Sequence, residues 1–160
     1  MFTRATHRMK TVSEKAPTDF SVKTVAASDF ILATREFIDE NFRGAVRFES
    51  GALVSGYVEL SPSGFAYLIK LILNEVYGSS LVTLAINADN EGISVKVDYG
   101  LAKINLEIIE SVAKSSGFSV EYGEGGILCL RLKSRRLEAS VLYAISVEDL
   151  YKYITETFFG

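Results

Sequence analysis

Apolar residues along this chain recur with two spacings, one typical of helices and one typical of strands. After Ser61 and Pro62 they lie three and four residues apart as far as Gly78, which predicts a helix with one apolar stripe. The stripe comprises Phe65, Leu68, Ile69, Ile72 and Val76. Serine suits the N-cap, proline the first helical position and glycine the end, so the expected helix has start and stop signals.

The rest of the chain predicts three or four helices and about seven strands in all. The other expected helices are Ser28–Phe42, Leu101–Ser116 and one that opens at Ser146, with Asp149 completing a pair like a capping box. The seven expected strands are Ala45–Glu49, Val54–Leu60, Leu81–Ile86, Ile93–Asp98, Phe118–Tyr122, Ile127–Leu132 and Leu137–Ile145, and Val22–Val25 could add a short edge strand. The helix Leu101–Ser116 carries two apolar stripes, so we expect it to pack on more than one side.

Turn residues such as those of Asn87–Gly92 and Gly123–Gly126 join several strands like hairpins. This favours a mixed, partly antiparallel sheet with helices on one face, an α/β (α+β) two-layer sandwich. We expect residues 1–21 to be a flexible arm. Residues 22–160 are expected to form a single domain with an extra C-terminal strand and helix.

Composition limits the function classes. The chain has 160 residues, 48% of them hydrophobic, and a formal charge of −3, so one domain with a substantial core is expected and general nucleic-acid binding is not. Cys129 is the single cysteine, which excludes an internal disulfide, argues against a zinc site and favours a cytoplasmic location. Apolar runs are too short for a membrane span. With one histidine, no Ser–His–Asp set can be argued.

Some polar residues stand where a site would need them. Lys70 and Asn74 are four residues apart and project together from the expected helix. Asp98 ends an alternating strand beside Tyr99 and Gly100. Each also has a simpler interpretation: Asn74 as an exposed polar residue, Lys70 as a solvated or salt-bridged lysine and Asp98 as a cap of the next helix. Cys129 is interpreted as a small core residue.

The order of these elements from Val22 to Leu132 resembles one complete ATPase domain of the histidine-kinase type, the GHKL or Bergerat fold. The resemblance implies that Asn74 holds Mg²⁺ through a bound ATP or ADP and that Asp98 accepts a hydrogen bond from the adenine amino group. Lys70 stands where the family has a residue that polarises the attacking group. Gly125-Gly126-Ile127-Leu128-Cys129-Leu130 resembles the family's closing glycine-and-strand signature.

The glycine boxes of that family are incomplete here. Asp98-Tyr99-Gly100-Leu101-Ala102 matches Asp-x-Gly-x-Gly with alanine for the second glycine, and Lys103-Ile104-Asn105-Leu106 replaces Gly-Leu-Gly-Leu. No residues remain between the boxes for a lid. Because backbone N–H groups must approach phosphate closely, side chains at Lys103 and Asn105 would obstruct a triphosphate, although Lys103 could offer charge.

His7 lies in a segment that resembles the phosphoacceptor box of these kinases, Phe2-Thr3-Arg4-Ala5-Thr6-His7-Arg8-Met9-Lys10-Thr11. Arg8 replaces the usual acid and Val12 the usual proline. In the family this box begins a long helical hairpin, and the residues between His7 and Val22 are too few to form one. The default interpretation of His7 is a histidine in a flexible arm.

Three hypotheses follow. The first is a degenerate histidine-kinase-type ATPase domain, a regulatory or protein-interaction module of signal transduction without catalysis, which binds ATP or ADP with Mg²⁺ weakly or uses no cofactor. Its site would comprise Asn74, Asp98, Gly100, Lys70 and Lys103. The second is an active histidine kinase or phosphotransfer protein that uses His7 and needs a partner. The third is a purely structural binding domain.

Overall fold

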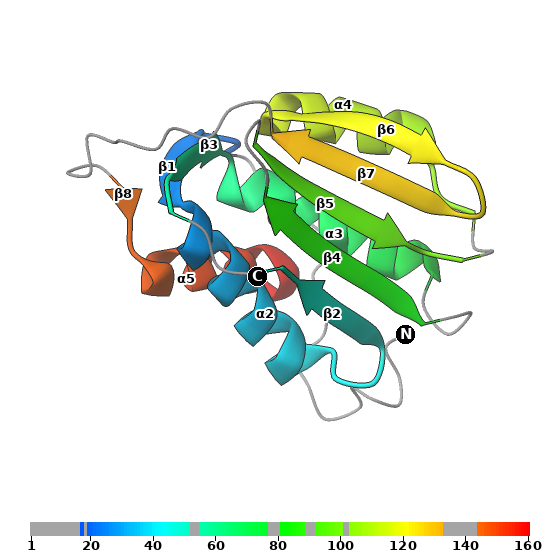
Figure 1. The fold of residues 1–160 in the computed structure, drawn as a ribbon, viewed down its shortest axis with the longest axis horizontal. Coiled ribbons are helices and arrows are strands. Elements are labelled where there is room, and N and C mark those ends of the chain that lie inside the picture. Colours follow the sequence, from blue (N-terminus) through cyan, green and yellow to red (C-terminus); the bar gives the residue numbers. More distant parts are fainter. Residues whose placement is uncertain are drawn as a thin grey trace.

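The structure, a computed structural model, describes residues 17, 19–51, 55–76, 81–88, 92–100, 103–132 and 144–160 (Figure 1). His7, most of the expected arm and the first part of the expected strand Leu137–Ile145 lie outside these ranges. Across the described ranges, none of the helices has the length and apolarity that crossing a bilayer requires.

Within the described residues, the main sheet has five strands in the order β2-β4-β5-β7-β6 (Figure 1). Strand β2 pairs with β4 in parallel, and the other three pairings are antiparallel, so the predicted mixed sheet is confirmed. Its strands are β2 Val46–Ser50, β4 Val82–Ala88, β5 Ile93–Asp98, β6 Phe118–Gly123 and β7 Ile127–Leu132.

A second, three-stranded sheet, β3-β1-β8, comprises β3 Tyr57–Leu60, β1 Lys23–Ala26 and β8 Ala144–Ile145. The sequence did not predict this division into two sheets. Strand β3 follows β2 in the chain, yet β3 pairs antiparallel with β1 and β2 pairs parallel with β4. Local turn residues report where a strand ends, whereas pairing depends on distant segments.

The described helices are α2 Ala27–Asn41, α3 Pro62–Val76, α4 Leu106–Ser116 and α5 Val147–Phe159, and they lie on one side of the main sheet (Figure 1). Two predicted caps are confirmed: Ser61 Oγ accepts from Gly64 N–H at 3.0 Å, and Ser146 Oγ accepts from Asp149 N–H at 3.1 Å. The two-layer α/β class is therefore as predicted.

Two predicted helix starts are wrong. Helix α2 begins at Ala27 with Ala26 as its N-cap, so Ser28 does not cap it. Helix α4 begins at Leu106 rather than Leu101, because Asn105 is the N-cap and its Oδ1 accepts from Ile108 N–H at 3.2 Å. Lys103 therefore precedes the helix.

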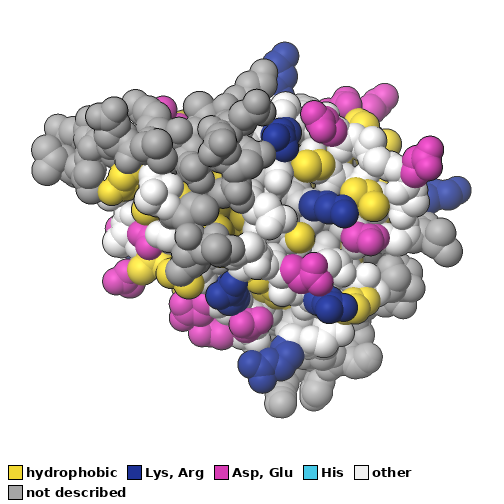
Figure 2. Space-filling view, in the orientation of Figure 1, with side chains coloured by type: hydrophobic (Ala, Val, Ile, Leu, Met, Phe, Trp, Pro, Cys, Tyr) yellow, Lys and Arg dark blue, Asp and Glu magenta, His cyan; other side chains and the backbone are white. Residues whose placement is uncertain are grey.

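One face of the main sheet is buried under the helices and the other is open. Alternate residues of its central strands form the buried face: Val82, Leu84, Ile86, Val95, Val97, Leu128, Leu130 and Leu132. The residues between them, among them Thr83, Lys96 and Asp98, are half-buried or exposed. Positive and negative side chains are interspersed over the surface seen in the same orientation in Figure 2, which is typical of a solvated sheet face.

Helix α4 packs on one side only, which corrects the expectation of packing on two. Its buried residues are Ile109, Ala113 and Ser116, whereas Leu106 and Ile108 are exposed. Helix α3 lies very close to the C-terminal end of α4, because a Cβ on Gly64 of α3 would lie 1.9 Å from Ser116 Oγ of α4. Only glycine fits there without displacing the neighbouring helix.

Helix α5 completes the core beside α2 and α3. Leu150, Ile154 and Phe158 face inward at helical spacing, and burial of each such side chain contributes about 1.5–3 kcal/mol. The ring of Phe158 lies 4.7 Å from that of Phe37 and 5.4 Å from that of Phe42, measured between centroids. At the rim, the Tyr151 hydroxyl donates to Glu40 Oε2 of α2 at 2.5 Å.

The Tyr151–Glu40 contact predicts a loss of stability at alkaline pH. Burial first, then the hydrogen bond and the negative charge of Glu40, raise the pKa of Tyr151 to about 12. The unfolded chain loses this proton near pH 10, so the stability due to the neutral phenol is complete below pH 10 and is lost between about pH 10 and 12. The free energy of unfolding of Tyr151→Phe, measured with denaturant, should fall less steeply over this window than that of the wild type.

Tyr122, whose pKa burial and Glu110 also raise to about 12, remains in that variant, so part of the slope should persist. Identical slopes for the wild type and Tyr151→Phe would contradict the assignment.

Candidate functional site

Asn74 and Lys70 lie on α3, one turn apart, but in different surroundings. Asn74 is exposed near the end of the helix, whereas Lys70 is 1% exposed. The interpretation of Lys70 as a solvated lysine is therefore wrong. The reason is α5, which the sequence did not place against this side of α3.

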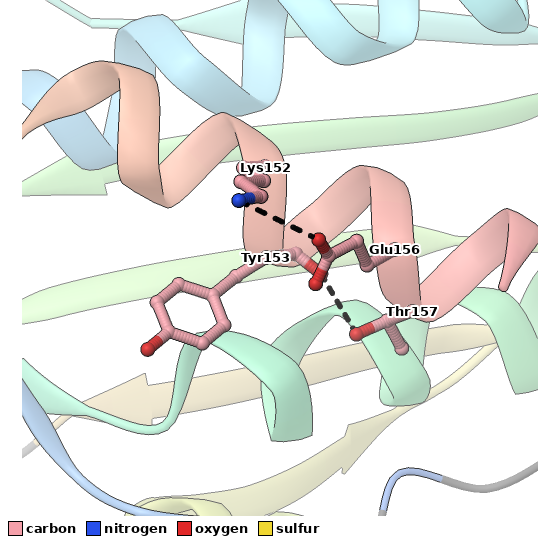
Figure 3. A network of polar contacts seen from close by, with 4 residues as sticks. All are labelled: Lys152, Tyr153, Glu156 and Thr157. Atoms are coloured by element: carbon pink, nitrogen blue, oxygen red, sulfur yellow. Dashed lines mark hydrogen bonds and ion pairs between the residues drawn. The ribbon is translucent and has the colours of Figure 1, made fainter.

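The side chain of Lys70 reaches the last turn of α5. Its Nζ donates to the carbonyl oxygen of Thr157 at 3.1 Å and lies 5.4 Å from the centroid of the Tyr67 ring. The Thr157 hydroxyl in turn donates to the carbonyl of Tyr153 at 2.8 Å, within α5 (Figure 3). A cation is favourable at a helix C-terminus, where carbonyl groups lack helical partners. Lys70 thus joins α3 to α5.

Asp98 ends β5 on the open face of the main sheet. It pairs with Thr83 and Ile127 across the sheet and follows Val97, whose side chain is buried under the helices. Because successive side chains of a strand point to opposite faces, the carboxylate of Asp98 projects away from the helix layer. Its Oδ1 accepts from Gly100 N–H at 3.2 Å, so Asp98 stabilises its own turn and does not cap α4.

The turn after Asp98 packs against the glycine turn between β6 and β7. Tyr99 N–H donates to the carbonyl of Gly126 at 2.9 Å, and both Gly100 and Gly126 have positive φ, +68° and +81°. A Cβ on Gly126 would lie 1.8 Å from the carbonyl oxygen of Gly100. The two glycine motifs that the sequence singled out separately therefore form one backbone contact.

Lys103 is exposed in the segment before α4, and Asn105 uses its side chain to cap that helix. Leu101 and Ala102 lie outside the described residues. The carboxylate of Asp98 and the helix that carries Asn74 are on opposite sides of the main sheet. The five residues predicted for one site thus lie in three different places. Asn74 and Lys70 are on α3, where Lys70 packs against α5. Asp98 and Gly100 form the turn after β5, and Lys103 lies in the exposed segment before α4.

Other candidate groups do not add a catalytic set. Cys129 is half-buried on the open face between Lys96 and Glu121 rather than in the core, and burial is the main cause that raises the pKa of its thiol. Among the described residues, no group of three His, Cys, Asp or Glu could hold a metal ion. His7 is outside these residues, so its role as a phosphoacceptor stays a prediction.

Comparison with known proteins finds matches among solved structures. No family model matches the chain, and no curated protein matches it by sequence. Among solved structures, the cytoplasmic segment of the histidine kinase QseC matches with 18% identity and a TM-score of 0.49 over 72% of this chain and 80% of that one. The ATP-binding domain of PrrB from Mycobacterium tuberculosis matches with 16% identity and a TM-score of 0.47, over 72% and 98%.

The catalytic domain of the histidine kinase ThkA matches with 13% identity and a TM-score of 0.49, over 71% of this chain and 96% of that one.

Sequence reasoning missed two contacts of this region. The hydrogen bond from Lys70 to Thr157 joins residues 87 positions apart, and no sequence pattern near either residue predicts it. The contact between Gly100 and Gly126 had a signal, since both glycines belong to turns at the ends of strands that were expected to share a sheet.

The Lys70 contact predicts a loss of stability on removal of its amine. Lys70→Met keeps most of the buried chain but leaves the Thr157 carbonyl without this donor, so the free energy of unfolding should fall by about 1–3 kcal/mol. Lys152 on the outer face of α5, 3.9 Å from Glu156 and exposed, is the matched control. Lys152→Met should change stability by less than about 0.5 kcal/mol in the same denaturant titration. Equal free energies of unfolding for Lys70→Met and Lys152→Met would show that the Lys70 amine does not stabilise the packing of α5.

The glycine contact predicts a difference between two adjacent substitutions. Gly125 and Gly126 both have positive φ, but a Cβ on Gly125 would meet nothing within 4 Å. Gly125→Ala should therefore lower the free energy of unfolding by about 1–2 kcal/mol, the cost of the left-handed conformation. Gly126→Ala should cost a further 1–3 kcal/mol or so, because it also displaces the Gly100 backbone. The order of the two values in thermal or denaturant unfolding checks this, and the reverse order would contradict the packing.

Proposed function

We propose that this chain is a degenerate ATPase-like domain of the histidine-kinase type that works as a regulatory or protein-interaction module in signalling. In this proposal nucleotide binding is weak and catalysis is absent. Four sequence features support the proposal: Asn74 on a central helix, Asp98-Tyr99-Gly100 after a central strand, the glycine pair Gly125-Gly126, and the order in which they occur.

The observation that carries the loss of nucleotide chemistry is the orientation of Asp98. A carboxylate that is to meet the same nucleotide as Asn74 must face the helix layer, and this one faces away from it and accepts from Gly100 N–H. Phosphoryl transfer depends on convergent groups that position the phosphates and balance their charge. Asn74, Asp98 and Lys70 as placed do not fit around one Mg²⁺–ATP.

An interaction role follows from what remains. The turn at Gly100 and the cap at Asn105 are close in the sequence, so few residues lie between them to form a mobile cover. The open face of the sheet offers interspersed charges of both signs, a surface suited to a complementary protein partner. The competing hypothesis of phosphotransfer through His7 has no support among the described residues and stays a prediction from the sequence.

Isothermal titration with Mg-ATP and Mg-ADP tests the proposal. We expect no binding tighter than a Kd of about 0.1 mM and no release of phosphate. Asp98→Asn and Asn74→Ala change exposed side chains, so they should keep the fold and alter any residual Kd by less than about twofold, a change of roughly 0.4 kcal/mol. Submicromolar binding that both substitutions abolish, with turnover, would overturn the proposal in favour of an active ATPase.

A further inference from the structure

The two outer strands of the main sheet are protected unequally. On β2, exposed Arg47 and Glu49 form an ion pair at 3.0 Å. Arg35 of α2 bonds to Ser50 Oγ, and its guanidinium carbon lies 5.5 Å from the centroid of the Phe48 ring. Charged side chains and a covering helix are the usual protection of an edge strand. The β2 edge therefore has both.

The β6 edge has fewer charges, although α4 packs along the strand. Strand β6 pairs with β7 and, within the described part of the chain, with no other strand (Figure 1). It runs Phe118-Ser119-Val120-Glu121-Tyr122-Gly123, with a single charged side chain and no proline or lysine. A long edge of this composition presents unpaired N–H and C=O groups to any strand that fits beside it.

Exposed apolar side chains border the same edge. Tyr122 is 42% exposed and Leu106 of α4 is 40% exposed. Helix α4 packs along β6, and Glu110, one turn after Leu106 on the same side of α4, is near enough to the Tyr122 hydroxyl to raise its pKa. A strand added to β6 would bring further residues against both apolar groups.

The sequence of β6 is complementary to itself in an antiparallel pairing. A two-fold axis at Val120 places Phe118 opposite Tyr122 of a second copy and Ser119 opposite Glu121 of that copy, so no like charges meet. Side-chain alternation is also kept by an axis at Glu121, but two carboxylates would then lie directly opposite, which is destabilising. Only the register centred on Val120 pairs the strand over its length with complementary neighbours on both faces.

We propose that the chain forms a two-fold symmetric dimer through β6, with Val120 at the axis, so that two main sheets join into one continuous sheet. The interface is isologous, each copy contributing the same strand and the same flank of α4. Its backbone hydrogen bonds supply affinity, and the Ser119–Glu121 pairs on the open face select the register.

Charge substitutions at Ser119 test both dimer and register. Sedimentation of the full chain from about 1 μM to about 1 mM should show a concentration-dependent dimer. Ser119→Glu places a second carboxylate opposite Glu121 twice per dimer, so the dimer Kd should rise roughly five- to tenfold. Ser119→Glu combined with Glu121→Lys restores opposite charges and should return the Kd to near the wild-type value.

Ser94 supplies the matched control. It lies on the open face of the central strand β5 and, like Ser119, is a cross-strand partner of Arg131. Ser94→Glu therefore introduces the same charge beside the same arginine away from the edge, and it should leave the Kd unchanged. A monomer throughout the concentration range, or a dimer that Ser94→Glu and Ser119→Glu affect equally, would overturn the proposal, and circular dichroism confirms that each variant is folded.

Discussion

The burial of one face of the main sheet is the constraint on which the rest of this structure depends. In β5, Val95 and Val97 lie under the helices, so Lys96 and Asp98 must lie on the open face. A slip of one residue would expose both valines and bury both charges, a cost of several kcal/mol at least. The side of the sheet from which Asp98 projects is thus set by the packing of its neighbours, and no local change of rotamer reverses it.

The same constraint explains why residues that suggest one site in the sequence have different roles in the fold. Lys70 lies in the contact between α3 and α5, where its amine donates to the Thr157 carbonyl. Asp98 and Gly100 form a turn supported by Gly126, and Asn105 determines where α4 begins. These are contributions to architecture. Residues whose order resembles a family's motifs can thus have structural roles in packing and turns.

Much of the fold followed from local pattern, because helical and strand periods and caps are local properties. The stripe of α3, the alternation of β5 and the caps Ser61 and Ser146 were all read from short segments. The start of α4 could not be predicted in this way. Apolar Leu101 and Ile104 continue the stripe of α4 toward the N-terminus, but the residue that caps the helix is Asn105. Sheet membership and the burial of Lys70 depend on partners far along the chain. The candidate site was predicted as residues but not as geometry, since convergence of side chains is a property of the tertiary fold.

Helix α5 lies late in the described sequence and packs against α2, the first described helix. Phe158 packs against Phe37 and Phe42, and β8, just before this helix, pairs in parallel with β1. While the ribosome is still synthesising the middle of the domain, α2 has an apolar face with no cover, and β1 has one neighbour instead of two. This packing is therefore completed only after translation has passed Phe158, and until then the rings of Phe37 and Phe42 lack that partner.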